Sequence, residues 1–243
     1  MNIENYTKIE KLGEGGFGKV YKYKNNYTKE LVAIKFEKKD NYSLLKNEAK
    51  IYNLLRKCNG ISNLRGWGSN DINYYMIIDI LYPLKKEKKH YTTYCKEMLD
   101  IIKVVHDMGI IHRDLKPSNF MITQENSVRL IDFGLSKMYR ENKNHIQLCY
   151  NNEPIGSFNY ISINVHKGFN GSRRDDVVSI LYIYLNFINM GLPWDSLEDN
   201  ENILTNKIEY FNEKSSLSKL IHKITNLKFS EKPNYSECKK YFI

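Results

Sequence analysis

The sequence has few cysteines, few prolines and no long uninterrupted hydrophobic run. Its 243 residues include 4 cysteines and 5 prolines. The cysteines form no C-x-x-C pair, which argues against a disulfide scaffold or a zinc site and favours reduced thiols inside a cell. The longest apolar stretch, Val177 to Met190, is interrupted by polar residues and is shorter than the ~20 residues of a membrane span.

The first residues also lack the basic and apolar parts of a secretory signal. We therefore expect an intracellular protein with no membrane partner, in the cytoplasm, with the nucleus as the alternative. Hydrophobic residues make up 42% and charged residues 27% of the chain, which is typical of a globular protein with a substantial core. A monomer is expected.

The charge balance is basic, with 37 Lys and Arg against 28 Asp and Glu and a net charge of +9. This charge attracts anionic partners such as acidic or phosphorylated proteins, nucleic acid or lipid headgroups. The chain carries no basic-aromatic repeat and no recognised nucleic-acid motif, so nucleic acid is not indicated beyond nonspecific charge.

The first eighty residues alternate short apolar runs with turn residues, which predicts antiparallel strands. The expected strands are Tyr6–Leu12, Val20–Lys24, Leu31–Phe36, Leu64–Trp67 and Tyr74–Ile80. One helix interrupts them, from Ser43 to Leu55, and its apolar spacing places Glu48 on or beside the apolar face.

After Pro83 the chain becomes mainly helical. The pattern predicts a helix over Tyr91–Met108 and a second one that opens at Ser172 with a capping box of the form S-x-x-D. The fold class is therefore α+β, with a small antiparallel β-rich part at about 1–80 and a larger helical part at about 81–243.

A glycine-rich stretch, Gly13-Glu14-Gly15-Gly16-Phe17-Gly18, lies between the first two expected strands. Glycines let the backbone bend sharply and bring its N–H groups against phosphate oxygens. A plain glycine-rich hairpin is the alternative. A Rossmann turn would require a helix next, whereas Val20-Tyr21-Lys22 continues as a strand.

Lys35 lies within the apolar strand Val32-Ala33-Ile34-Lys35. A buried, unpaired ammonium costs several kcal/mol, so an inward Lys35 requires an anionic partner. Glu48, an acid on an apolar helix face thirteen residues later, is the natural partner. The pair would hold Lys35 against the α- and β-phosphates of a nucleotide. The alternative is a lysine that reaches solvent along its stem.

The strongest motif is Ile111-His112-Arg113-Asp114-Leu115-Lys116-Pro117-Ser118-Asn119, followed by Asp132-Phe133-Gly134. Phosphoryl transfer is catalysed mainly by positioning and charge neutralisation. Asp114 would then orient the acceptor hydroxyl and accept its proton, and Lys116 would neutralise the migrating γ-phosphoryl group. Asn119 and Asp132 would hold Mg²⁺ on the phosphates.

Together these motifs make the chain resemble a eukaryotic protein kinase. The resemblance implies a single bilobal kinase domain over 1–243, with ATP between the lobes and protein substrates. The backbone around Asp79 and Leu81 would pair with adenine, and the lid would come from Leu12, Val20 and Ala33. The residues implied for the nucleotide site are Leu12, Gly13, Glu14, Gly15, Gly16, Phe17, Gly18, Lys19, Val20, Ala33, Lys35, Glu48, Asp79 and Leu81.

The second half is similar to the casein kinase 1 group, including its vaccinia-related branch. It reads Ser-Ile-Asn at 162–164 and Ser-Arg-Arg-Asp-Asp at 172–176. The resemblance implies acidic or already phosphorylated substrates, with Arg173 and Lys207 as residues of an anion site. Alternatively, the pair Arg173-Arg174 would simply link the capping-box turn to nearby carboxylates. Asp176 resembles the family's buried aspartate that braces the catalytic loop.

The sequence therefore predicts a serine/threonine protein kinase that uses ATP and Mg²⁺, because every charged group that the mechanism requires is present. Lys116, two residues after Asp114, resembles the serine/threonine version of the loop. The alternative is a nucleotide-binding pseudokinase that acts as an interaction module.

Overall fold

A computed structural model describes residues 3–15, 18–39, 43–142, 144–212 and 215–242. The chain divides into two compact units, the first made of 1–83 with 121–134 and the second of 84–120 with 135–243. Segment 121–134 thus belongs by its contacts to the first unit. In the described part of the chain, no helix is both long and apolar enough to span a membrane.

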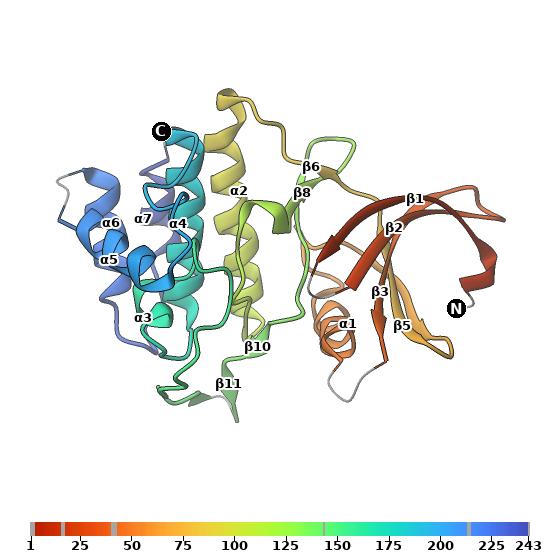
Figure 1. Ribbon diagram of the computed structural model, residues 1–243, viewed down its shortest axis with the longest axis horizontal. Coiled ribbons are helices and arrows are strands. Elements are labelled where there is room, and N and C mark those ends of the chain that lie inside the picture. The colour runs from red at the N-terminus through yellow and green to blue at the C-terminus, as the bar shows by residue number, and fades with distance from the viewer. Residues whose placement is uncertain (1–2, 16–17, 40–42, 143, 213–214, 243) are drawn as a thin grey trace. The chain divides into compact units, whose positions relative to one another are not determined.

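The first unit is built on a five-stranded antiparallel sheet in the order β1-β2-β3-β5-β4 (Figure 1). Its elements are η1 (Ile3–Asn5), β1 (Tyr6–Gly15), β2 (Gly18–Asn25), β3 (Leu31–Lys38), α1 (Leu44–Leu55), β4 (Leu64–Ser69), β5 (Asn73–Asp79), β6 (Tyr82–Pro83), β8 (Phe120–Ile122, which starts at the unit's boundary) and β9 (Val128–Leu130). Ser43 caps α1 by accepting the Lys46 N–H, as expected where a serine precedes an apolar helix.

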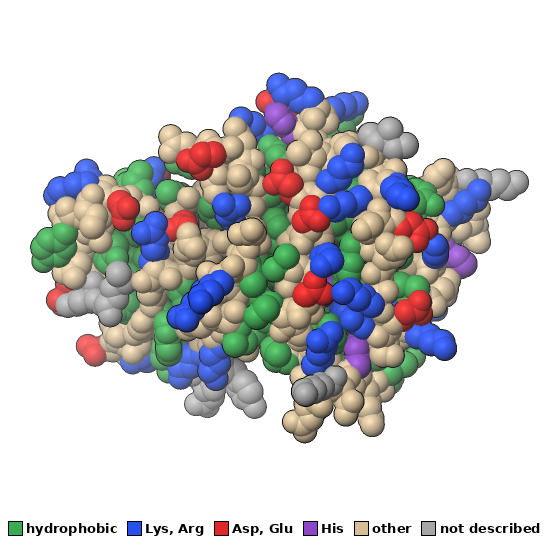
Figure 2. All heavy atoms as spheres, turned by 180° about the vertical axis from the view of Figure 1, so that it is seen from behind, with side chains coloured by type: hydrophobic (Ala, Val, Ile, Leu, Met, Phe, Trp, Pro, Cys, Tyr) green, Lys and Arg blue, Asp and Glu red, His purple; other side chains and the backbone are tan. Residues whose placement is uncertain are grey.

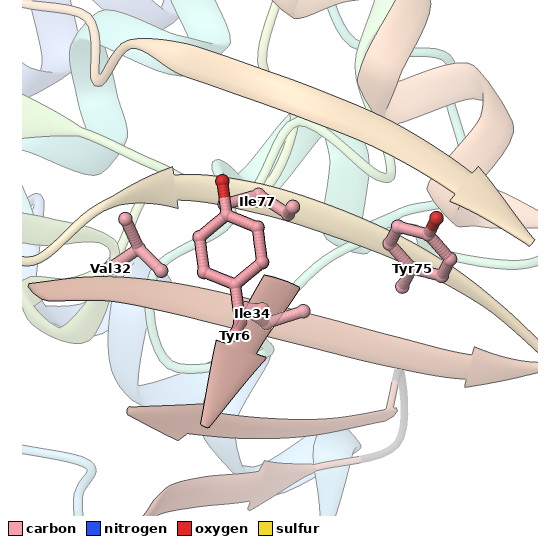
Figure 3. Packing of buried hydrophobic residues seen from close by; sticks show 5 residues of the cluster. All are labelled: Tyr6, Val32, Ile34, Tyr75 and Ile77. Carbon is pink, nitrogen blue, oxygen red and sulfur yellow. The ribbon is translucent and has the colours of Figure 1, made fainter. Parts of the chain in front are cut away.

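The two faces of this sheet differ. One face carries a core cluster of Tyr6, Val32, Ile34, Tyr75 and Ile77 (Figure 3). Because successive side chains of a strand alternate between faces, Lys35 and Ala33 of β3 lie on the opposite face.

The second unit is mainly helical. Its elements are α2 (Lys88–Asp107), β7 (Ile110–Ile111), η2 (Pro117–Asn119), β10 (Lys137–Met138), β11 (Arg140–Glu141), β12 (Asn144–His145), α3 (Ile163–His166), α4 (Arg173–Asn189), α5 (Asn200–Tyr210), α6 (Ser216–Thr225) and α7 (Tyr235–Lys239). Helix α2 packs along α4, and α7 and α6 cover α2 and α4 respectively (Figure 1).

Helix α4 explains why the longest apolar run is not a membrane span. Every residue from Arg173 to Leu185 is buried, which makes α4 the central helix of the second unit. Its predicted capping box is confirmed, since Ser172 and Asp175 bond reciprocally at its N-terminus. The predicted fold class, an antiparallel β-rich part followed by a larger helical part, is also confirmed.

Candidate active site

The glycine-rich hairpin joins β1 to β2, with Gly15 paired to Gly18; Gly16 and Phe17 lie outside the described residues. Gly18 is required by the hairpin itself: its φ is 120° and an added Cβ would lie 2.0 Å from the carbonyl oxygen of Phe36. At Gly13 and Gly15 an added Cβ would meet no described atom within 4 Å. The protein's own described packing therefore does not explain these two glycines, and the space beside them is open to a ligand.

Glu14 and Lys19 flank this hairpin at its surface. The Glu14 carboxylate pairs with the ammonium groups of Lys11 and Lys19, and all three side chains are about half exposed. Such exposed pairs contribute little to stability, typically 0–1 kcal/mol. The two predicted residues thus lie at the hairpin with their side chains in solvent.

Two residues of the predicted apolar lid, Val20 and Ala33, lie on the face of the sheet that carries Lys35. Val20 of β2 is directly opposite Lys35 of β3, and Ala33 lies two residues earlier on the same face. Ala33 is buried, Val20 is half-buried and Leu12 is 47% exposed. Val20 and Ala33 thus provide an apolar surface suited to a planar ring, and Leu12 belongs to β1, the strand next to β2.

Lys35 joins the two predicted acids of the first unit. Its Nζ lies 2.8 Å from Oε2 of Glu48 and 2.9 Å from Oδ1 of Asp132. Burial opposes the charge on Lys35, but the carboxylates of Glu48 and Asp132 outweigh it and raise the lysine pKa above its ordinary value. Lys35 is therefore held as an ammonium ion on the face of the sheet opposite the core cluster.

Asp132 has a left-handed backbone, with φ 64°, which is unusual for a residue other than glycine. Strained positions of this kind cluster at functional sites, where the surrounding structure enforces them. The neighbouring Phe133 is fully buried against Tyr52 of α1, with ring centroids 5.0 Å apart. The packing of Phe133 thus anchors the backbone that presents the Asp132 carboxylate.

Glu48 gives the first testable prediction, in the pH dependence of stability. Burial raises its pKa to about 7 although Lys35 opposes the shift. A raised carboxyl pKa contributes stability that is complete below the unfolded value, near 4.5, and is lost as the pH rises through 7. We expect the free energy of unfolding of the wild type, relative to Glu48→Gln, to fall by on the order of 1–3 kcal/mol between pH 4.5 and 7.

Urea unfolding of both proteins at pH 5, 6, 7 and 8 measures this difference. Glu198→Gln, at an exposed position of the second unit, is the matched control and should show no such trend. A constant difference between wild type and Glu48→Gln over the whole range would contradict the raised pKa.

The segment predicted to pair with the adenine base, around Asp79 and Leu81, begins at the end of β5. The Asp79 carboxylate is used within the first unit, where Oδ1 accepts from Arg65 Nε at 2.6 Å and Oδ2 from Asn63 Nδ2 at 2.6 Å. Leu81, two residues later, is buried. Because the Asp79 side chain is engaged with Arg65 and Asn63, any base recognition by this segment would use its backbone groups.

In the second unit, Asp114 is the centre of a polar cluster and is 5% exposed. Its Oδ1 accepts from the backbone N–H of Ser157 at 2.8 Å and from the Ser157 hydroxyl at 2.7 Å. Lys116 Nζ lies 2.9 Å from Oδ2 of Asp114 and donates to the Ser157 hydroxyl at 3.0 Å. The structure thus brings the predicted base and the predicted phosphoryl-binding lysine together.

Asn119 completes this cluster through its amide nitrogen. Nδ2 donates to the Asp114 carbonyl oxygen at 2.8 Å, which leaves the amide oxygen of Asn119 as an acceptor. Amide and carboxylate oxygens are the ligand types that Mg²⁺ prefers, and Mg²⁺ sites commonly combine one or two of them with phosphate oxygens. The donor chemistry of Asn119 and Asp132 therefore suits Mg²⁺.

A set of buried hydrogen bonds holds the backbone of the catalytic loop at His112 and Arg113, just before Asp114. Asp176 of α4 accepts the backbone N–H groups of His112 and Arg113 at 2.7 and 2.9 Å. His106 Nε2 lies 2.9 Å from the same carboxylate, and its Nδ1 lies 2.7 Å from the Tyr235 hydroxyl. A carboxylate only accepts, so Nε2 carries the proton and Tyr235 donates to Nδ1. Helices α2, α4 and α7 together fix the loop before Asp114.

The catalytic loop also contacts the segment that begins at Gly156, through the backbone of Arg113. Arg113 has φ 73° and Gly156 has φ 113°. A Cβ on Gly156 would lie 2.4 Å from the Arg113 carbonyl oxygen. Only glycine allows this approach, which brings Ser157 to Asp114.

Arg173 and Lys207, the residues predicted for an anion site, are both buried and bind carbonyl oxygens. Arg173 donates to the Ser230 carbonyl oxygen at 2.5 Å, and its guanidinium lies 4.8 Å from the Tyr139 ring centroid. Lys207 donates to the carbonyl oxygens of Phe158 and Ile161. Arg173 and Lys207 thus bind carbonyl oxygens of different segments, and the anion site stays a prediction.

Sequence reasoning gave no role to Ser157, His106 or Tyr235. Ser157 follows a glycine at the start of a family-like segment, and that Gly-Ser pair was the signal available. His106 and Tyr235 are separated by 129 residues, and nothing in the local patterns joins them. These hydrogen bonds form because helices α2, α4 and α7 pack together.

Comparison with known proteins defines the class of protein. A family model described as "Protein kinase domain" matches residues 6–243. The chain belongs to the protein kinase family, and within that family it belongs to the casein kinase I group. It is 33% identical to a probable casein kinase I homolog of Encephalitozoon cuniculi over 96% of this chain and 82% of the relative.

Two further relatives come from Schizosaccharomyces pombe. The chain is 31% identical to casein kinase I homolog 2 and 30% identical to casein kinase I homolog 1, over 98% of its own length in both cases. It spans 62% and 60% of the lengths of these two relatives. The predicted resemblance to a casein kinase 1 type of protein kinase is confirmed.

Proposed function

We propose that the chain transfers the γ-phosphate of ATP, with Mg²⁺, to serine or threonine hydroxyls of protein substrates. The observation that carries this proposal is the Asp114 cluster. Its carboxylate is held in place by Ser157, Lys116 and Asn119, and a general base for an acceptor hydroxyl must be positioned in this way. The names of the relatives, all casein kinase I homologs, support the same activity.

Each of the site residues would have a distinct role in this reaction. Lys35, held by Glu48, would bind the phosphates of the nucleotide, and the open space beside Gly13 and Gly15 would admit them. Asp114 would orient the acceptor hydroxyl and take its proton, while Lys116 would offset negative charge on the transferred group. Asp132 and Asn119 would hold Mg²⁺, which neutralises phosphate charge when bound.

Acidic or phosphorylated substrates are the finer part of the proposal. The net charge of +9 favours anionic substrates in general. On the face seen in Figure 2, Lys and Arg side chains are interspersed with Asp and Glu and do not form one continuous patch. The attraction of acidic proteins would therefore come from the net charge and not from one patch on this face. The expectations of a monomer and of a cytoplasmic location stay predictions.

Transfer from labelled ATP to casein, with purified full chain and Mg²⁺, tests the proposal. We expect phosphoserine or phosphothreonine in the product, no transfer with a chelator present, and activity without prior treatment by another kinase. If the folded protein binds ATP yet transfers nothing to casein, to primed peptides or to itself, the pseudokinase alternative replaces the proposal.

A further inference from the structure

Lys207 is a lysine of α5 whose side chain is completely buried. Among the described residues no carboxylate pairs with it, although an unpaired buried ammonium is costly. Its Nζ instead donates to the carbonyl oxygens of Phe158 and Ile161, the latter at 2.8 Å. The rings of Tyr182 and Trp194 lie beside it, with centroids 5.2 and 5.5 Å from Nζ.

The two carbonyl groups belong to the segment that leads away from the Asp114 cluster. Phe158 directly follows Ser157, whose N–H and hydroxyl both bind Asp114. A third carbonyl oxygen of this segment, that of Asn159, accepts from Trp194 Nε1 at 2.9 Å. Buried side chains from α5 and from the Trp194 turn thus hold three carbonyl groups within four residues.

We propose that Lys207 is a positioning residue, which holds segment 158–161 and through it places Ser157 against Asp114. The inference rests on the proposed kinase function. It assigns Lys207 a role that does not depend on a phosphate group in the substrate, in contrast to the anion site that the family resemblance implies. The burial of a lysine without a carboxylate is explained by the two hydrogen bonds that Nζ donates to this segment, which no apolar residue could replace.

Lys207→Met tests the proposal, because it keeps the length of the side chain and removes the donor. Its substrates are one acidic serine peptide, with and without a second, phosphorylated serine. We expect kcat/KM to fall about 10- to 100-fold for both peptides alike, since small displacements of catalytic groups have effects of this size. The KM for ATP should stay within about twofold of the wild type.

The matched control is Lys219→Met, an exposed lysine of α6, which should retain wild-type kinetics. Circular dichroism at the assay temperature verifies that both variants are folded. A loss confined to the phosphorylated peptide would assign Lys207 to an anion site and overturn the proposal, as would unchanged kinetics. An inactive wild type would instead refute the kinase function.

A second measurement uses the wild type and needs no activity. Burial lowers the pKa of Lys207 to about 7, so at pH 8 an accessible Lys207 would be a reactive amine. We expect acylation by a water-soluble amine reagent, followed by mass spectrometry, to modify Lys219 and leave Lys207 unmodified in the folded protein. Rapid modification of Lys207 that the phosphorylated peptide suppresses would show an accessible anion site and overturn the proposal.

Discussion

Asp114→Asn is expected to lower kcat by about 10²- to 10⁴-fold, the usual contribution of a general base. Asparagine has nearly the shape of aspartate, but it cannot take the proton of an acceptor hydroxyl. It also offers one acceptor oxygen where Asp114 offers two, and those two receive the donors of Ser157, Lys116 and Asn119. The KM for ATP should change little, because Asp114 acts on the acceptor.

Steady-state kinetics with varied peptide and varied ATP measure this effect. Asp71→Asn, at an exposed position of the first unit, is the matched control and should behave as the wild type does. Retention of more than about a tenth of kcat by folded Asp114→Asn would show that another group accepts the proton.

The sequence predicted well those features that depend on local periodicity or on a chemical need. The helix α1 followed from apolar spacing, and its Glu48 from the rule that a buried lysine needs an anion. The structure places the two side chains 2.8 Å apart. Asp132 as a second partner of Lys35 lies 97 residues away, and only the fold could reveal that contact.

The sequence carried less information about features that depend on burial. Arg173 and Lys207 are the residues that the family resemblance implies for an anion site, and that site stays a prediction. In the structure both side chains turn inward to carbonyl oxygens. Which way a long side chain turns is decided by packing with segments distant in the chain, and composition and spacing carry no information about that choice.

The hydrogen bonds that hold the catalytic loop could likewise be predicted only in part from the sequence. Asp176 was identified from its resemblance to a family aspartate, and it accepts the N–H groups of His112 and Arg113. Its own partner His106, and Tyr235 behind it, come from α2 and α7. A chain of this kind requires three helices at fixed distances, and each of its members, taken alone, is an ordinary residue of an amphipathic helix.

Lys35→Met is expected to lower kcat/KM for ATP by about 10²- to 10³-fold, the size seen when one charge-stabilising donor is removed. It should also destabilise the protein by roughly 3–5 kcal/mol, because Glu48 would be left buried without its cation. The two effects must be separated, since an unfolded variant is also inactive.

The double variant Lys35→Met, Glu48→Gln separates them. It removes the buried charge together with its partner, so its urea midpoint should recover most of the loss, whereas its activity should stay at the level of Lys35→Met. Recovery of both stability and activity would mean that Lys35 acts only as a counterion for Glu48. Recovery of stability alone would assign Lys35 to the nucleotide, because the one function that the double variant cannot restore is a positive charge at that position of β3.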